Sequence, residues 1–274
     1  DCDPYHLIAP CFWSPLGLSI PPDQFDIDIA DLYWSPGKSP DRYPHAAGLD
    51  NHVRLAGAAR RPFWFMPLAA GWYAPSAITP REQRLQTWLG IIRGARGLCY
   101  WTYINTYPAM RAMLKQLAGE VRQVAPALLH HDPARAVLKQ DEAGLHALAF
   151  DHDGALYLLA ALNRGDVRAA VEFRLAGCGP ADRAEVLFED RAVPLQDGTL
   201  KDVFEPYGVH VYRLPAPGEA PGLELILDSS EPVARSGARR WPDFPDAESL
   251  TTIPNGGFED SEDGQARIWY PSCS

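Results

Sequence analysis

The chain has 274 residues, of which 46% are hydrophobic and 22% are charged, and its formal net charge is −10. These values are typical of a folded globular protein and exclude an intrinsically disordered or low-complexity chain. An acidic surface repels phosphate groups, so nucleic acid is not expected as a partner. No apolar run approaches the roughly 20 residues that a membrane-spanning helix needs, so no membrane is expected as a partner either.

Residues 1 to about 130 alternate short apolar segments with helical patterns, which predicts βα units and a parallel sheet. The clearest helix begins at Thr79, which is expected to form a capping box with Glu82, and its apolar stripe continues to Ile92. A second amphipathic helix begins at Pro108 and is expected to end near Pro126. Four segments bounded by Gly, Pro or Asp predict strands: 6–12, 25–33, 62–68 and 97–103.

From about Arg135 the period of the apolar residues changes from 3.6 to 2, which is typical of β-strands. Turn dipeptides such as Asp153-Gly154 separate these short strands, and the pattern predicts a small antiparallel β-sandwich. Residues 215 to about 250 are rich in Pro, Glu, Ser and Ala and show no periodicity, so they are expected to form a linker.

Several motifs together resemble glycoside hydrolases built on a (β/α)8 barrel. The segment 78–103 resembles the seventh helix and eighth strand of such barrels, and DPYHLIAP and FDIDIADLY are similar to earlier strands. The segment that ends in DVFEPYGVHVYRL is similar to the β-sandwich domain that follows many of these barrels. NGGFED, with Trp269 downstream, is similar to the first strand of a galactose-binding-like carbohydrate-binding module.

This resemblance implies an α/β fold in which about four βα units of a partial (β/α)8 (TIM) barrel precede a small all-β antiparallel sandwich domain. The four units correspond to strands five to eight, so the chain is expected to be the C-terminal half of a barrel with two exposed sheet edges. The expected regions are 1–132 for the half barrel, 133–215 for the sandwich, and 216–274 for a linker and the start of the carbohydrate-binding module.

Such glycosidases place two carboxyl groups beside the scissile bond, at the C-terminal ends of barrel strands. The resemblance implies one acid upstream of residue 1 and one after strand seven, but residues 62–73 contain no Asp or Glu. Asp31, near the end of segment 25–33, is the best-placed carboxylate and the predicted catalytic residue. Its alternative role is that of a hydrogen-bonded structural acid. A complete catalytic pair is not expected within this chain.

Aromatic side chains follow the predicted strands of the first half, at the end where a barrel builds its site. Because Trp and Tyr rings stack on the apolar C–H faces of sugars, these side chains are predicted substrate contacts. They are Tyr33, Trp34, Trp72, Tyr73, Trp101 and Tyr103. For any one of them, core packing is as good an explanation.

Histidines and cysteines show no metal-ligand spacing, so no metal and no cofactor are expected, and the cysteines are interpreted as buried thiols. No nucleophile elbow, P-loop or dinucleotide fingerprint occurs in the sequence. Three functions stay open: a fragment of a glycoside hydrolase that acts on O-glycosidic bonds of oligo- or polysaccharides, a non-catalytic carbohydrate-binding protein, and a structural interaction module.

Overall fold

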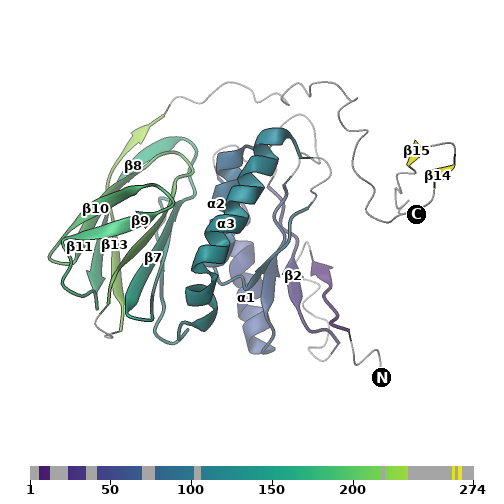
Figure 1. Ribbon diagram of the computed structural model, residues 1–274, viewed down its shortest axis with the longest axis horizontal. Coiled ribbons are helices and arrows are strands. Elements are labelled where there is room, and N and C mark those ends of the chain that lie inside the picture. Colours follow the sequence, from purple (N-terminus) through teal and green to yellow (C-terminus); the bar gives the residue numbers. More distant parts are fainter. Residues whose placement is uncertain are drawn as a thin grey trace. The chain divides into compact units, whose positions relative to one another are not determined.

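The computed structural model describes residues 6–12, 24–34, 42–69, 78–101, 106–216 and 220–233, together with two short strands near the C-terminus. Those strands, β14 (Ser261–Glu262) and β15 (Gln265–Ala266), pair with each other and belong to a separate unit, residues 242–274. The larger unit, residues 1–241, is a mixed α/β structure in which a large antiparallel sheet accompanies a few helices and a small parallel sheet (Figure 1).

The parallel sheet has four strands in the order β1-β2-β3-β4. Every neighbouring pair is parallel, and Ile29 in the centre stands opposite both Cys11 and Trp64. The prediction of a parallel sheet from these four segments is therefore confirmed, although each strand is shorter than its segment. The strands are β1 (Cys11–Phe12), β2 (Asp28–Ala30), β3 (Phe63–Phe65) and β4 (Gly97–Leu98).

Three helices accompany the sheet: α1 (Ala46–Ala58), α2 (Pro80–Ile92) and α3 (Pro108–His130). α2 begins with the predicted capping box, in which Thr79 accepts from the Glu82 N–H and Glu82 accepts from the Thr79 N–H at 2.8 Å. α1 was not among the predicted elements because its apolar stripe is short and no capping side chain precedes it.

The predicted end of α3 near Pro126 is wrong, since the helix continues to His130. Proline removes one helical N–H, which weakens a helix without always ending it. Here Val124 and Ala127 on either side of Pro126 are both buried, and the His131 N–H bonds to the Ala127 carbonyl at 3.0 Å. Tertiary packing thus holds the last turn in place.

Helices α1 and α2 cover one face of the parallel sheet. Phe63 and Phe65 point to this face: Phe63 stacks on His52 of α1, and Phe65 packs against Gly90 of α2. Because side chains alternate along a strand, Trp64 points to the opposite face, as does Asp31 directly after β2. α3 packs on α2, and both helices contact the antiparallel sheet, which lies beside them (Figure 1).

The second half of the chain forms a nine-stranded sheet in the order β13-β8-β11-β10-β9-β12-β7-β6-β5. All its pairs are antiparallel, as predicted for this region. The sheet nearly closes on itself, since β13 at one edge also contacts β5 and β6 at the other. Its strands are β5 (Val137–Gln140), β6 (Leu145–His152), β7 (Ala155–Leu162), β8 (Val167–Ala176), β9 (Arg183–Leu187), β10 (Arg191–Gln196), β11 (Thr199–Phe204), β12 (Val209–Pro215) and β13 (Gly222–Pro232).

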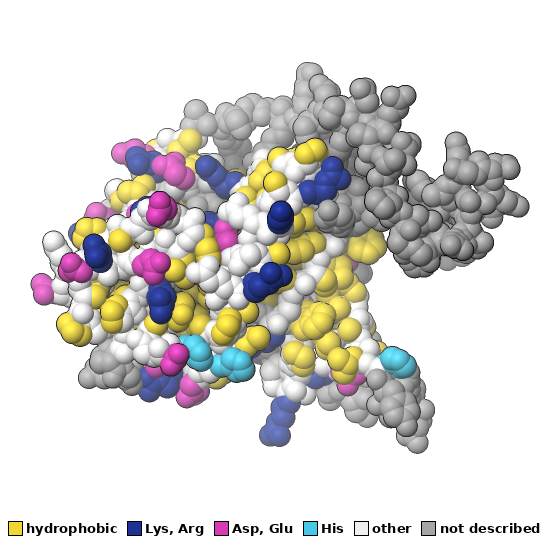
Figure 2. All heavy atoms as spheres, viewed as in Figure 1, with side chains coloured by type: hydrophobic (Ala, Val, Ile, Leu, Met, Phe, Trp, Pro, Cys, Tyr) yellow, Lys and Arg dark blue, Asp and Glu magenta, His cyan; other side chains and the backbone are white. Residues whose placement is uncertain are grey.

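The linker predicted from residue 215 is wrong for 222–232, because β13 pairs with β8 along its whole length. Leu223, Leu225 and Leu227 alternate along β13 and pack on the core inside the antiparallel sheet. This period of two is visible in the sequence, but the Asp, Ser, Glu and Pro that follow it dominate the local composition. Charged side chains of both signs are interspersed over the antiparallel sheet, on the left of the space-filling view (Figure 2).

The strands nearest the helices are buried on both faces. In β6, Leu145 and Ala147 point into the core of the antiparallel sheet, whereas Leu148 and Phe150 belong to the core shared with the helices. Strands buried on both faces have nearly continuous apolar sequences, which explains the run from Leu145 to Phe150.

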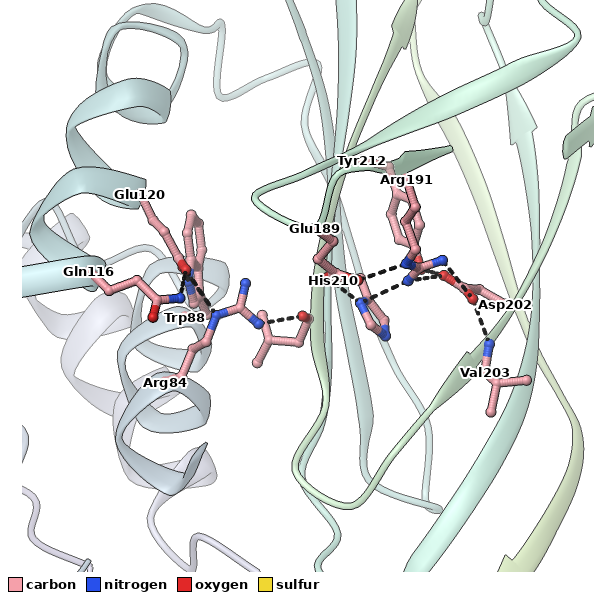
Figure 3. Close-up of polar contacts among 11 residues, drawn as sticks. Arg84, Trp88, Gln116, Glu120, Glu189, Arg191, Asp202, Val203, His210 and Tyr212 are labelled. Carbon is pink, nitrogen blue, oxygen red and sulfur yellow. Dashed lines mark hydrogen bonds and ion pairs between the residues drawn. The ribbon is translucent and has the colours of Figure 1, made fainter. Parts of the chain in front are cut away.

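A buried carboxylate joins the helices to this sheet (Figure 3). Glu120 of α3 is 3% exposed and accepts hydrogen bonds from Trp88 at 2.9 Å, Arg84 at 3.1 Å and Gln116 at 2.7 Å. Arg84 also donates to the carbonyl of Val209 in β12 at 2.6 Å. The arginine therefore links α2, α3 and the antiparallel sheet through one guanidinium group.

Candidate functional site

The candidate site lies where the parallel strands end, on the face that α1 and α2 leave uncovered. Asp31 follows β2 directly, and Cys11 of the neighbouring β1 lies close enough to its side chain to affect its pKa. The sulfur of Cys11 also lies 3.7 Å from the sulfur of Met66, which follows β3. Cys99 follows β4 and is close enough for its pKa to be affected by the Asp31 charge. We call Cys11, Asp31, Tyr33 and Cys99 the Asp31 cluster.

The carboxyl group of Asp31 is half-buried, and its pKa is raised above the ordinary value because burial disfavours the charged form. The neighbouring Tyr33 and Cys11 side chains act in the opposite direction without cancelling this effect. One carboxylate oxygen, Oδ1, is buried and has no hydrogen-bond partner among the described residues. Asp31 can therefore hold a proton at a higher pH than an exposed aspartate and offer it to a bound group.

The other members of the cluster are neutral. Burial, followed by the charge of Asp31, raises the pKa of Cys11 to about 12. Cys11 is exposed as a residue, but its sulfur is partly enclosed by Met66 and Asp31. Burial and Asp31 also raise the pKa of Cys99 and that of Tyr33. Neither thiol is a reactive thiolate, so Asp31 is the one acid of the cluster.

The nearest strand carboxylate, Asp28, belongs to the opposite face. It is fully buried, and its Oδ2 lies 3.1 Å from Nδ1 of His52 in α1. Glu82 is occupied as the cap of α2. The described residues bring no second carboxyl group into hydrogen-bond contact with Asp31.

Trp34 is a core residue, which corrects its expected role as a sugar contact. Its side chain is 0% exposed, and its ring meets Tyr207 of the antiparallel half at 5.2 Å and Tyr43 at 6.0 Å, both edge to face. Tyr207 fits there because Gly165 beside it has no side chain: a Cβ atom at Gly165 would lie 2.1 Å from the Tyr207 ring. A ring without exposed surface cannot stack on a ligand.

The other predicted aromatic contacts have different positions. Tyr33 is half-buried, and its hydroxyl lies close enough to Asp31 for each group to affect the pKa of the other. Trp101 is 40% exposed and forms a parallel bridge with Leu68 just beyond β3 and β4. The structure thus places Asp31, Tyr33 and Trp101 at the same end of the sheet. The remaining three lie outside the described residues: Trp72, Tyr73 and Tyr103.

The two thiols of the cluster were missed as site residues. Cys11 is exposed and Cys99 is partly exposed, which corrects their interpretation as buried thiols. Alternation of side chains along segments 6–12 and 97–103 places both cysteines on the face that the helices leave uncovered. This alternation is the sequence signal that could have identified them as site residues. Neither forms a disulfide.

Within the described ranges, no group of three or more His, Cys, Asp and Glu side chains is arranged to hold a metal ion. None of the described helices is long and apolar enough to span a membrane.

No protein-family model and no curated protein matches the sequence. The solved structures that resemble it include glycoside hydrolases. An alpha-amylase from Geobacillus thermoleovorans, solved with acarbose, is 13% identical with a TM-score of 0.46, and the match covers 78% of this chain and 54% of the amylase. A GH30 endoxylanase from Clostridium papyrosolvens is 14% identical with a TM-score of 0.45, covering 76% and 55%.

A third structure, Amy13B from Eubacterium rectale, is 12% identical with a TM-score of 0.46, covering 76% of this chain and 52% of that protein. The chain thus spans about half the length of these structures. At these identities and TM-scores, the similarity assigns neither a family nor an activity, so the chemistry depends on the chain's own residues.

Proposed function

We propose that this chain is a carbohydrate-active protein, the C-terminal half of a barrel glycoside hydrolase that acts on O-glycosidic bonds of oligo- or polysaccharides. One observation carries the proposal: a half-buried carboxyl group of raised pKa, Asp31, shares the C-terminal end of a parallel sheet with the exposed ring of Trp101. Barrel enzymes build their sites at this end of the strands, and glycosidases need an acid that keeps its proton.

In this proposal Asp31 is the proton donor and Trp101 is the sugar platform. The Trp101 ring would stack on the apolar face of a sugar, which orients the glycosidic oxygen toward the carboxyl group. Tyr33 would hold the Asp31 carboxyl group in place through its hydroxyl group. The neutral thiols of Cys11 and Cys99 add no second charge that would raise the affinity for a cation or an anion.

A glycosidase needs two carboxyl groups, and the Asp31 cluster supplies one. In this proposal the second carboxyl group would come from the other half of the barrel, which would also complete the walls of the sugar site. The chain alone is therefore expected to bind sugars without hydrolysing them, and the complete gene product is expected to hydrolyse them.

The second candidate function is a carbohydrate-binding protein without catalysis. The single carboxyl group of the Asp31 cluster favours it, because one acid suffices for a hydrogen bond to a sugar hydroxyl. The complete gene product distinguishes the two functions: a glycoside hydrolase cleaves the polysaccharide, whereas a binding protein binds it without turnover.

The test is affinity electrophoresis of the chain in gels that contain soluble starch or xylan. We expect retardation in at least one of them, and Trp101→Ala should remove most of it, because a stacked ring contributes about 1 kcal/mol or more to binding. Trp101→Phe keeps a ring and should keep part of the retardation. The exposed Val203 is 39% accessible on the distant sheet, so Val203→Ala is the matched control.

Absence of retardation of the wild type in every polysaccharide gel would contradict both candidate functions and favour the third, a structural interaction module. Equal retardation of wild type and Trp101→Ala would contradict the role of Trp101. Hydrolysis of aryl glycosides by this chain alone would contradict the expectation that the second acid lies upstream.

A further inference from the structure

A pocket lies at the other end of the parallel sheet, away from the Asp31 cluster. It has a volume of about 910 Å³ and is lined by residues where β3 and β4 begin, Phe63 and Gly97, and by the last turns of α1, α2 and α3. Leu138 and Leu148 of the antiparallel sheet complete the lining. This volume is within the range of pockets that hold small molecules.

The walls of this pocket are mainly apolar, and part of its rim is exposed hydrophobic surface. Leu129 is 54% exposed and Leu138 is 44% exposed, and both line the pocket. Large hydrophobic side chains with this much exposure beside a cavity mark an interaction site more often than single ones elsewhere on a surface. The apolar lining residues further inside include Val53, Ala56, Ile91, Ile92, Leu98 and Val121.

Three arginines carry the charge of the pocket lining: Arg61, Arg93 and Arg96. The fourth ionisable lining residue is His131, and burial lowers its pKa, so it favours the neutral form. Arg93 is 5% exposed, its Nη1 pairs with Asp50 at 2.9 Å, and its Nη2 contacts Gln140 and His146. Its Nε is buried and has no hydrogen-bond partner among the described residues. Arg96 is exposed and donates from Nη1 to the Leu128 carbonyl at 2.7 Å. A guanidinium has five N–H donors, so both side chains retain donors for an anionic group.

The helix C-termini at this pocket disfavour the binding of an anion. The C-terminus of a helix carries a partial negative charge of about half a unit, and three helices end here. The three arginines outweigh these partial charges and the Asp50 carboxylate together. Arg96 bonds directly to a carbonyl in the last turn of α3, so part of its positive charge offsets the partial negative charge of that helix end.

We propose that this pocket binds a long-chain carboxylate, with the acyl chain against the apolar walls and the carboxylate at Arg93 and Arg96. Burial of the acyl chain against the apolar walls supplies most of the affinity. The two arginines select an acid over an alcohol of the same length, because charge-assisted hydrogen bonds to a carboxylate are stronger than neutral ones. This site is separate from the sugar site proposed at Asp31.

The experiment is isothermal titration of the complete chain with dodecanoate, and with dodecanol and acetate as probes of tail and head alone. We expect dodecanoate to bind at least about tenfold more tightly than dodecanol, which corresponds to about 1.4 kcal/mol. Acetate should give no measurable binding. Equal affinity for dodecanoate and dodecanol, or no binding of dodecanoate, would overturn the proposal.

Two helical glycines provide a matched pair of variants. Gly57 of α1 lines the pocket, and a Cβ atom there would meet nothing within 4 Å, so Gly57→Leu adds a side chain at the pocket wall. Gly119 of α3 is equally unobstructed but does not line the pocket. We expect Gly57→Leu to weaken dodecanoate binding at least about tenfold and Gly119→Leu to change it less than about twofold.

The head group is tested separately with Arg96→Gln, which keeps a donor for Leu128 but removes the charge. It should weaken dodecanoate binding about fivefold or more and leave dodecanol binding unchanged. Arg54→Gln, on the exposed surface of α1, is the control. Unchanged dodecanoate binding in both Gly57→Leu and Arg96→Gln, with native circular dichroism, would place the ligand elsewhere and overturn the proposal.

Discussion

Asp31 is the residue on which the candidate site depends, and its pKa has a consequence for stability. A carboxyl group whose pKa is higher in the folded protein binds its proton more tightly there than in the unfolded chain. Stability therefore decreases as the pH rises from the unfolded pKa, about 3.9, through the raised folded pKa. Above that window, charged Asp31 destabilises the fold.

We expect Asp31→Asn to raise the melting temperature at pH 7 by about 1–3 °C and to change it little at pH 3, where the wild-type carboxyl group is protonated. Thermal unfolding followed by circular dichroism at both pH values measures this difference. Asp182→Asn is the control, because the Asp182 side chain is 92% exposed. A lower melting temperature for Asp31→Asn at pH 7 would show that the charged form is stabilised instead.

At the same scale, alternation along β2 correctly separates Asp28, which faces a helix, from Asp31 on the other face. The same alternation places Tyr33 on the face of Asp31 and Trp34 on the face of Asp28, so the sequence held a signal that separates these two aromatic residues. What buries Trp34 could not be predicted. Tyr207 lies far along the chain, and its contact with Trp34 requires Gly165 to leave space. Long-range packing of this kind leaves no local signal.

Among the elements, α2 was predictable because its start is fixed by local chemistry. The capping box of Thr79 and Glu82 needs only residues that are three positions apart. The end of α3 was not predictable, because the turn after Pro126 is held by tertiary burial. The same reasoning applies to β13, whose partner β8 decides that it is a strand.

The junction of α2 and α3 depends on the buried Glu120 carboxylate. We expect Glu120→Gln to lower the free energy of unfolding by about 1–3 kcal/mol, because the amide loses the charge-assisted bonds from Arg84 and presents an NH₂ group toward other donors. Urea unfolding measures the change. Glu185→Gln is the control, since Glu185 is 61% exposed, and equal losses in both variants would contradict this role for Glu120.

For the whole molecule, the order of the sheets was predicted from the change in apolar period, and the near closure of the antiparallel sheet was not. Closure depends on β13 reaching β5 and β6, which lie more than sixty residues earlier in the chain. A period of two identifies strands but carries no information on which edges meet.

Near closure predicts that β13 is needed for stability. A chain that ends after residue 221 leaves β8 as an open edge and exposes the core side chains that Leu223 covers. We expect its melting temperature to fall by about 5 °C or more, and we expect its tendency to aggregate to rise. A chain that ends after residue 241 keeps the complete larger unit and should melt like the full chain. Similar melting of both truncated chains would contradict this requirement.

The contact between Trp34 and Tyr207 makes the two halves share one hydrophobic core. Neither half can therefore unfold alone without exposing buried rings of the other, and a single cooperative transition in calorimetry is the expected signature. The same contact limits how such chains diversify. Recombination that exchanges the antiparallel half for an unrelated module would leave Trp34 uncovered, so the two halves are expected to be inherited as a pair.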